Sequence, residues 1–339
     1  MEKLSQEKLK KRVTVNWEML LLVVIVLGFS IVVGSINPVF WSVDNFRTIL
    51  HQYSAVGVAA VGMTLVIISG GIDLSAGWSI ALGAVTMGAA YQATQSPVAG
   101  MLAAVAICTG VGALNGFLVT KTKLIPFVAT LATMSIAQGF LNIISEGKRV
   151  ALDDAMFKTL NNTSVGPVSL PTVLMVAAIF VGFILLRKTV LGTYTYSMGA
   201  DVQNTELAGV NVPFYKFWVY TVAGAFVGMA AILLGVRLTT VSGSITGNSL
   251  LMDIIAAVVL GGASIVGGKG SVWGTLVGVI LIGVITNACT LLRVNSTAID
   301  LFKGAAIIVA LVVGALAAYI QKQSEKKEIK KMKAYKMAN

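Results

Sequence analysis

The chain has 339 residues, of which 56% are hydrophobic and 12% are charged; an ordinary soluble domain has about 25% charged residues. A soluble protein of this size could not hide so much apolar surface from water, so the composition excludes a soluble enzyme, a disordered chain and a disulfide-rich secreted module. The composition predicts an all-α polytopic membrane protein.

The formal net charge is +11, and the basic residues gather at the two ends of the chain, in segments 1–16 and 321–339. We interpret both segments as cytoplasmic, because short loops and tails on the cytoplasmic side of a membrane are rich in Lys and Arg. Their positive charge then lies near anionic lipid, and we expect no nucleic-acid partner. Cys108 and Cys289 lie within apolar runs and predict neither a disulfide framework nor a metal site.

Between these ends, residues 17–320 form a single predicted transmembrane domain. Apolar runs of about 20 residues are long enough to cross a bilayer, and we predict about ten such spans. An even number places both termini on the same side, which the distribution of basic residues indicates is the cytoplasm. The predicted spans are Trp17–Ile36, Gln52–Ser69, Asp73–Gln92, Pro97–Val119, Ile125–Ile144, Leu170–Leu186, Phe214–Val236, Leu250–Val266, Ser271–Leu291 and Thr297–Ile320.

Two glycine-rich breaks interrupt longer apolar stretches, at Gly70–Leu74 and at Gly267–Ser271. Each break could be a tight turn or a broken helix that lines a cavity. A shift of 191 positions superposes Gly70-Gly71 on Gly261-Gly262, which suggests an internal duplication with one glycine break in each half. The predicted topology gives both copies the same orientation, however, whereas an inverted repeat requires opposite orientations.

Glycine also recurs at a spacing of four within several spans. This spacing places the small residues on one face of a helix, where two backbones can approach closely. We predict tight packing within the chain, and the alternative is a dimer interface or a moving seam. The residues concerned are Gly112 and Gly116, Gly224 and Gly228, and Gly270, Gly274 and Gly278.

Three carboxylates, Asp73, Asp253 and Asp300, lie near predicted span ends. A charge inside a membrane is costly and invites a functional interpretation. The simpler interpretation is a helix cap: Asp73, two residues before Ser75, is placed to accept free backbone N–H groups at a helix start, and Asp253 precedes the run Ile254–Leu260 in the same way.

A pathway for a polar solute needs uncharged hydrogen-bonding groups that face a cavity, and ordinary hydrogen bonds between helices are the alternative role for each such group. The candidate pathway residues are Gln52, Ser69, Asp73, Ser75, Ser79, Asn115, Gln138, Asn142, Ser264 and Asn287.

The sequence offers little for catalysis. It has a single histidine, His51, which argues against a histidine metal cluster. The segment Gly267–Gly270 is not a phosphate-binding loop, because Lys269 is followed by Gly270 where that loop requires Ser or Thr. We therefore predict no enzyme activity, no cofactor, no metal and no ATP site on this chain.

The connection 187–213 is predicted to lie in the cytoplasm. Asp201 can cap a short helix that runs to about Ala208 and is stopped by Gly209 and Pro213. Such a helix could dock a motor subunit, or it could lie on lipid headgroups.

At this connection the chain resembles a known family. Residues 197–212, 62–77, 125–134 and 256–275 are each similar to signature segments of ribose/galactose-type ABC importer permeases. Together they extend over nearly the whole chain. The resemblance implies a type II ABC importer-like fold in a bacterial inner membrane, a pair of permeases, a cytoplasmic ATP-binding cassette subunit that hydrolyses ATP, and an extracytoplasmic sugar-binding protein that delivers a monosaccharide.

The resemblance also implies that Gly199 through Gly209 form the helix that couples the permease to its ATPase. Glu206 departs from the family pattern, which commonly has a basic residue here, and suggests a cognate ATPase partner. A permease for nucleosides or branched-chain amino acids is the alternative, followed by an ATP-independent transporter. The predicted coupling residues are Gly199, Asp201, Asn204, Thr205, Glu206, Leu207, Ala208 and Gly209.

Overall fold

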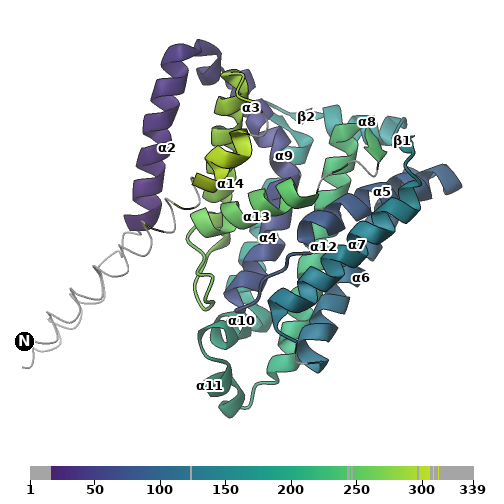
Figure 1. Cartoon of the computed structure of the whole chain (residues 1–339), viewed down its shortest axis with the longest axis vertical. Coiled ribbons are helices and arrows are strands. Elements are labelled where there is room, and N and C mark those ends of the chain that lie inside the picture. The colour runs from purple at the N-terminus through teal and green to yellow at the C-terminus, as the bar shows by residue number, and fades with distance from the viewer. Residues whose placement is uncertain are drawn as a thin grey trace, which may run out of the picture.

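The computed structural model describes residues 17–122, 124–242, 247–295 and 298–305, together with Ile245, Ile308 and Val312. The predicted terminal segments 1–16 and 321–339, and most of the predicted span Thr297–Ile320, lie outside the described residues. Within the described part, helices form nearly all of the regular structure, and the strands are short (Figure 1).

The helices begin where the local sequence provides a start signal. Ser96 accepts a hydrogen bond from the Ala99 N–H and Pro97 follows it, so α6 starts at Pro97 as predicted. The helical elements are α2 (Trp17–Ile36), η1 (Pro38–Trp41), α3 (Val43–Gln52), α4 (Ser54–Ile68), α5 (Ala76–Thr94), α6 (Pro97–Lys121), α7 (Pro126–Ser145), α8 (Ala155–Asn162), α9 (Leu170–Lys188), α10 (Val190–Ala200), α11 (Val202–Leu207), α12 (Val212–Leu238), α13 (Gly247–Leu260) and α14 (Val272–Leu291).

The all-α membrane fold is confirmed, but the count of ten spans is not. By length and composition, α6, α7, α9, α12 and α14 can each cross a membrane, and α3 with α4 can form a sixth span with a 48° bend. Helix α13 has 14 residues, so its length is about 21 Å at 1.5 Å per residue. A bilayer core is about 30 Å thick. The predicted span Leu250–Val266 is therefore wrong in its last six residues, because the helix ends at Leu260.

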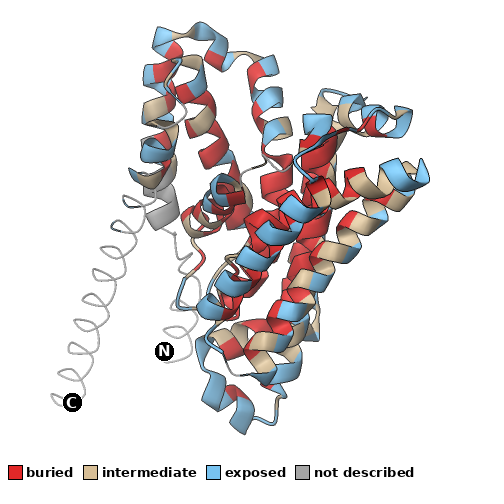
Figure 2. Cartoon of the chain, turned by 45° about the vertical axis from the view of Figure 1, so that its right-hand side comes forward, coloured by how far each residue is buried: buried red, intermediate tan, exposed pale blue. Residues whose placement is uncertain are grey.

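The core of the molecule lies around α4, whose residues are all buried (Figure 2). Helix α12 packs against α4, α5 and α6. In contrast, α6, α7 and α9 expose large apolar side chains such as Leu102, Phe140 and Phe180. A soluble surface would not carry so many contiguous apolar groups, and a lipid environment accommodates them.

The predicted glycine contacts are confirmed as packing within the chain. A Cβ added at Gly112 would lie 2.5 Å from the carbonyl oxygen of Tyr220 and 2.9 Å from the Cα of Gly224. A Cβ at Gly278 would lie 1.9 Å from the carbonyl oxygen of Ala257. The α6–α12 and α13–α14 backbones therefore approach more closely than any residue with a side chain would permit.

The two ends of the bundle differ. At the upper end in Figure 1, β1 (Arg149–Ala151) pairs antiparallel with β4 (Thr240–Ser242), and α8 lies beside them. A short hairpin, β2 (Ser164–Val165) with β3 (Val168–Ser169), leads into α9. A hydrogen bond from the exposed Lys158 lowers the pKa of the Asp153 carboxyl at this end. At the lower end, α10 packs against α4, α9 and α12, and α11 projects beyond it (Figure 1).

Helices α4 and α13 end in turns of the same type. The Gly70 N–H donates to Ile67 O and the Gly71 N–H to Val66 O, each at 3.0 Å, and Gly70 has a φ of 73°. After α13, Gly262 has a φ of 83°, its N–H donates to Val259 O, and the Ala263 N–H donates to Val258 O. This is the hydrogen-bond pattern of a glycine helix cap. The two turns correspond at a shift of 192 residues, one more than the shift of 191 that aligns the glycine pairs in the sequence, and the internal duplication stays a prediction.

Candidate functional site

A buried polar cluster joins the segment before α5 to α6 and α7. Asp73 Oδ1 accepts hydrogen bonds from the Ser75 N–H (2.9 Å), Ser75 Oγ (2.6 Å) and Asn115 Nδ2 (3.3 Å). Asn115 Nδ2 also lies 2.8 Å from Ser75 Oγ, and its Oδ1 accepts from Thr133 Oγ1 at 2.5 Å. All four residues are buried. The N-cap residue of α5 is Ser75 rather than Asp73, and Asp73 accepts the Ser75 N–H just before the helix begins. Three of the candidate pathway residues lie together here.

Four other candidate pathway residues are buried or half-buried, and one of them, Asn287, forms side-chain hydrogen bonds with another element. Ser69 Oγ donates to Val66 O at the end of α4. Asn287 on α14 exchanges two side-chain hydrogen bonds with Asn45, at 2.9 and 2.8 Å. The backbone of Ser264 closes the turn after α13. Ser79 is buried, and its Oγ has no hydrogen-bond partner among the described residues. A role for these four in solute passage stays a prediction.

The remaining candidates are exposed. Gln52 ends α3, and its carbonyl accepts a hydrogen bond from Arg237 at 2.7 Å. Gln138 and Asn142 lie on the exposed side of α7, and the exposed Ser135 shares their helical face at spacings of three and four residues. An uncharged polar stripe in the middle of an apolar helix is poorly suited to lipid, which cannot form hydrogen bonds with it.

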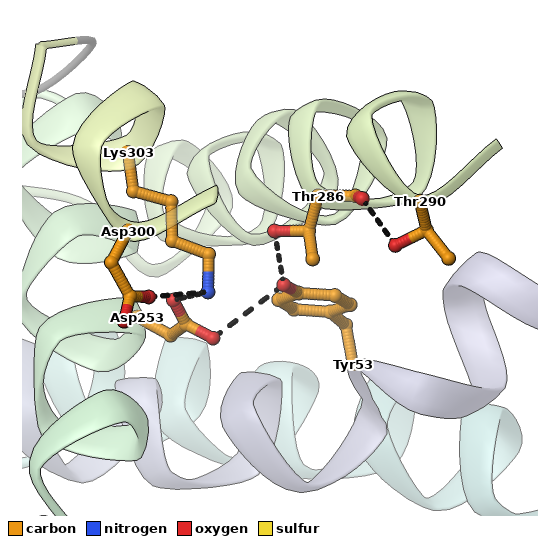
Figure 3. Close-up of polar contacts among 6 residues, drawn as sticks. All are labelled: Tyr53, Asp253, Thr286, Thr290, Asp300 and Lys303. Carbon is orange, nitrogen blue, oxygen red and sulfur yellow. Dashed lines mark hydrogen bonds and ion pairs between the residues drawn. The ribbon is translucent and has the colours of Figure 1, made fainter. Parts of the chain in front are cut away.

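Sequence reasoning missed a buried ion pair. Lys303 Nζ lies 2.8 Å from Asp253 Oδ1 on α13 and 4.0 Å from Asp300 (Figure 3). Asp253 and Lys303 are each 7% exposed. The Tyr53 hydroxyl lies 2.6 Å from Thr286 Oγ1 and 3.5 Å from Asp253 Oδ2. The cluster therefore connects four parts of the chain: the start of α4, α13, α14 and the helical segment 298–305.

The predicted capping role of Asp253 is wrong. Helix α13 begins at Gly247, six residues before Asp253, so the carboxylate lies in the middle of the helix, where the backbone N–H groups are already used. The sequence signal that could have indicated this ion pair is a basic residue inside a predicted span. Lys303 is such a residue, near the start of an apolar run and three positions after Asp300. Charges within a membrane tend to be paired.

The predicted coupling segment consists of two helices. Asp201 ends α10 and caps α11: its Oδ1 accepts the Asn204 N–H at 3.0 Å, and its carbonyl accepts from Thr205 Oγ1 at 2.6 Å. The predicted cap is thus confirmed. The expectation of one helix from Gly199 through Gly209 is wrong, because Gly199 belongs to α10 and α11 covers Val202–Leu207.

Helix α11 presents most of its side chains to the outside. Thr205 is buried, while Asn204, Glu206 and Leu207 are exposed, and Leu207 is 85% exposed. Ala208 and Gly209 follow, also exposed, and a φ of 82° at Gly209 turns the chain toward α12. Helix α11 therefore offers an apolar side chain, Leu207, and a carboxylate, Glu206, at the surface.

Comparison with known proteins places this geometry in context. Residues 45–318 match the family model described as "Branched-chain amino acid transport system / permease component". The chain is 36% identical to the ribose import permease protein of Haemophilus influenzae over 83% of this chain and 88% of that protein. It is 34% identical to the ribose import permease protein of Bacillus subtilis, over 84% and 88%. It is 31% identical to the L-arabinose transport system permease protein of Escherichia coli, over 80% and 84%. No solved structure matches the chain.

Proposed function

This chain belongs to the family of branched-chain amino acid transport system permease components, and from that premise we propose that it is the membrane permease of an ABC importer for a monosaccharide, ribose or a related sugar. The supporting observation is the similarity to ribose and arabinose permeases over 83% and 80% of the chain, respectively. ATP hydrolysis then belongs to a partner chain, and this chain provides the conduit through the membrane.

The proposal assigns the two ends of the bundle to different partners. The exposed α11 contacts a cytoplasmic ATP-binding cassette subunit, and both termini lie on that side. The opposite end, with α8 and the β1–β4 pair, faces the extracytoplasmic sugar-binding protein. A second copy of the permease completes the pathway. This assignment follows the bias of basic residues toward the cytoplasm and the exposure of Glu206 and Leu207.

The proposal is tested by copurification from native membranes in mild detergent, followed by mass spectrometry. We expect a stoichiometric ATPase and a binding protein whose bound ligand is a sugar. The family description mentions branched-chain amino acids, so a binding protein that holds an amino acid would favour the alternative, an amino acid permease. A homo-oligomer recovered in good yield without an ATPase would contradict the importer.

We further propose that the polar stripe of Ser135, Gln138 and Asn142 on α7 lines the sugar pathway between two permease copies. A sugar exchanges its hydrogen bonds with water for bonds to amide and hydroxyl groups along such a stripe. The large apolar side chains beside the stripe, such as Ile143 at 70% exposure, face lipid in this arrangement.

Replacement of Asn142 by tryptophan tests this assignment. We expect ribose uptake by the reconstituted importer to fall to a small residual fraction, because the indole would fill the path and remove an amide. The matched control is Ile143→Trp, one residue away on the lipid-facing side, which should retain uptake. Equal uptake by both variants would contradict the assignment of the stripe.

A second substitution tests the docking surface. We expect Glu206→Arg to weaken stimulation of the cognate ATPase, because charge reversal at an exposed contact replaces attraction with repulsion. The defect should be smaller at high salt, which screens exposed charges. Glu206→Gln, which removes the charge without reversing it, should have a smaller effect. Unchanged ATPase stimulation by Glu206→Arg would count against a role for Glu206 in docking.

A further inference from the structure

Gly199 lies where three distant segments of backbone meet. A Cβ added at Gly199 would lie 1.8 Å from the carbonyl oxygen of Ile68, at the end of α4, and 2.6 Å from the backbone nitrogen of Gly268, in the loop between α13 and α14. The last turn of α10 is thus pressed against the end of α4 and against the loop between α13 and α14. In Figure 1 the green loop after α13 descends toward α10.

Hydrogen bonds hold the same three segments together. The Gly268 N–H donates to Ile68 O at 2.9 Å, which joins the α13–α14 loop to α4. The Tyr196 hydroxyl on α10 donates to Gly270 O, also at 2.9 Å. A Cβ added at Gly267 would lie 2.7 Å from Gly199 O and 2.9 Å from the Cα of Gly70. We call Gly70, Tyr196, Gly199 and residues 267–270 the glycine junction.

This contact is mechanically stiff because it is formed largely by backbone. A side chain between two segments can change rotamer when one segment moves. Where the two backbones touch directly, the movement of one segment displaces the other or breaks the contact. Gly199 is two residues from Asp201, which closes α10 by donating its N–H to Ser197 O and caps α11 with its carboxylate. A displacement of α11 therefore displaces Gly199 as well, because few residues separate them.

We propose that Tyr196 and Gly199 are positioning residues that transmit movement of α11 to the turn after α4 and to the loop between α13 and α14 at the same time. This inference rests on the proposed function, in which α11 contacts the ATPase. The turn after α4 leads through Asp73 to the polar cluster with Asn115 and Thr133. The loop between α13 and α14 follows directly on α13, which carries the buried Asp253. One motion of the ATPase thus reaches both buried polar clusters.

The test uses the complete importer, with its own ATPase and binding protein, in proteoliposomes. Ribose uptake and ATP hydrolysis are measured in the same vesicles for wild type, Tyr196→Phe and Gly199→Ala. We expect both variants to bind the ATPase and hydrolyse ATP, and the ribose transported per ATP to fall several-fold. Tyr196→Phe removes one hydrogen bond without adding volume, so it keeps the test valid if Gly199→Ala fails to fold.

Two glycine controls separate coupling from packing. Gly110→Ala in α6 meets open space and should match wild type. Gly224→Ala is crowded by the backbone of α6 but lies outside the glycine junction, so it should lower thermal stability without changing the ratio of ribose to ATP. This ratio is the readout that a merely structural role would not change.

The outcomes separate this inference from the proposed function. If the wild-type chain couples to its ATPase and Tyr196→Phe retains the wild-type ratio of ribose to ATP, the role of the glycine junction is overturned and the importer stands. If the wild-type chain binds no ATPase, the proposed function fails and this inference fails with it. A several-fold loss of the ratio in Tyr196→Phe, with normal ATPase binding, supports the inference.

Discussion

Replacement of Lys303 by methionine will destabilise the folded chain by about 3–5 kcal/mol, because it leaves a buried charge without its partner. Lys303 is the cation 2.8 Å from Asp253 Oδ1, and both side chains are buried. Methionine approximates the volume of the lysine stem, so the change removes mainly the ammonium group. A large fall in the melting temperature of the purified protein in detergent is the expected measurement.

Two further variants isolate the ion pair. Asp253→Leu combined with Lys303→Met removes both charges, and we expect it to recover much of the lost stability, since well-packed apolar residues often replace a buried ion pair at little cost. Asp300→Asn should have a small effect, within about 1 kcal/mol, because Asp300 is exposed and its carboxylate is 4.0 Å from Lys303. A Lys303→Met protein that melts at the wild-type temperature would show that the pair does not hold α13 in place.

The sequence predicted the helices best where short-range signals mark their ends. Ser96 with Pro97, and Asp201 with Asn204, set helix starts through contacts within three residues. Such signals are readable without knowledge of the fold. Long apolar composition likewise predicted the bilayer-length helices, because it depends on the solvent around the helix rather than on a particular neighbour.

What the sequence could not indicate depends on distant residues. Asp253 pairs with Lys303, fifty positions later, so its position before an apolar run suggested a cap, and nothing in the residues next to Asp253 indicated an ion pair. The length of α13 was overestimated for a related reason: apolar residues after Leu260 continue the hydropathy pattern, but the positive φ at Gly262 ends the helix. Hydropathy does not reveal which glycine of a pair adopts that conformation, which also explains the one-residue difference between the sequence match at 191 and the match of the two turns at 192.

The sequence indicated which residues could belong to the candidate site, but only partly which of them are in contact. Asp73 and Ser75 are neighbours in sequence, so their contact could be expected from a helix-start pattern. Their link to Asn115 crosses between helices, and the glycine junction unites positions 70, 199 and 267. A glycine-rich segment indicates that another part of the backbone can approach closely, but it does not identify that part. The pathway and coupling proposals therefore depend on contacts between residues that are distant in the sequence.

The contact between α6 and α12 supports the second prediction with a large expected effect. Gly112→Leu would place a branched side chain where a Cβ alone already lies 2.5 Å from Tyr220 O and 2.9 Å from the Cα of Gly224. Overpacking of a core typically costs about 1–3 kcal/mol when neighbouring side chains can adjust. Here the obstacles are backbone atoms, so we expect a cost at or above the upper end of this range and little folded protein.

Gly110 provides the matched control two residues away on the same helix. A Cβ at Gly110 meets nothing within 4 Å, so Gly110→Leu adds the same apolar volume to α6 without a collision. We expect size-exclusion chromatography of the tagged proteins in detergent to give a monodisperse peak for Gly110→Leu and aggregate for Gly112→Leu. If Gly112→Leu also gave a monodisperse peak with wild-type stability, α6 and α12 would have to be separable without loss of the fold, and glycine at position 112 would not be required for their packing.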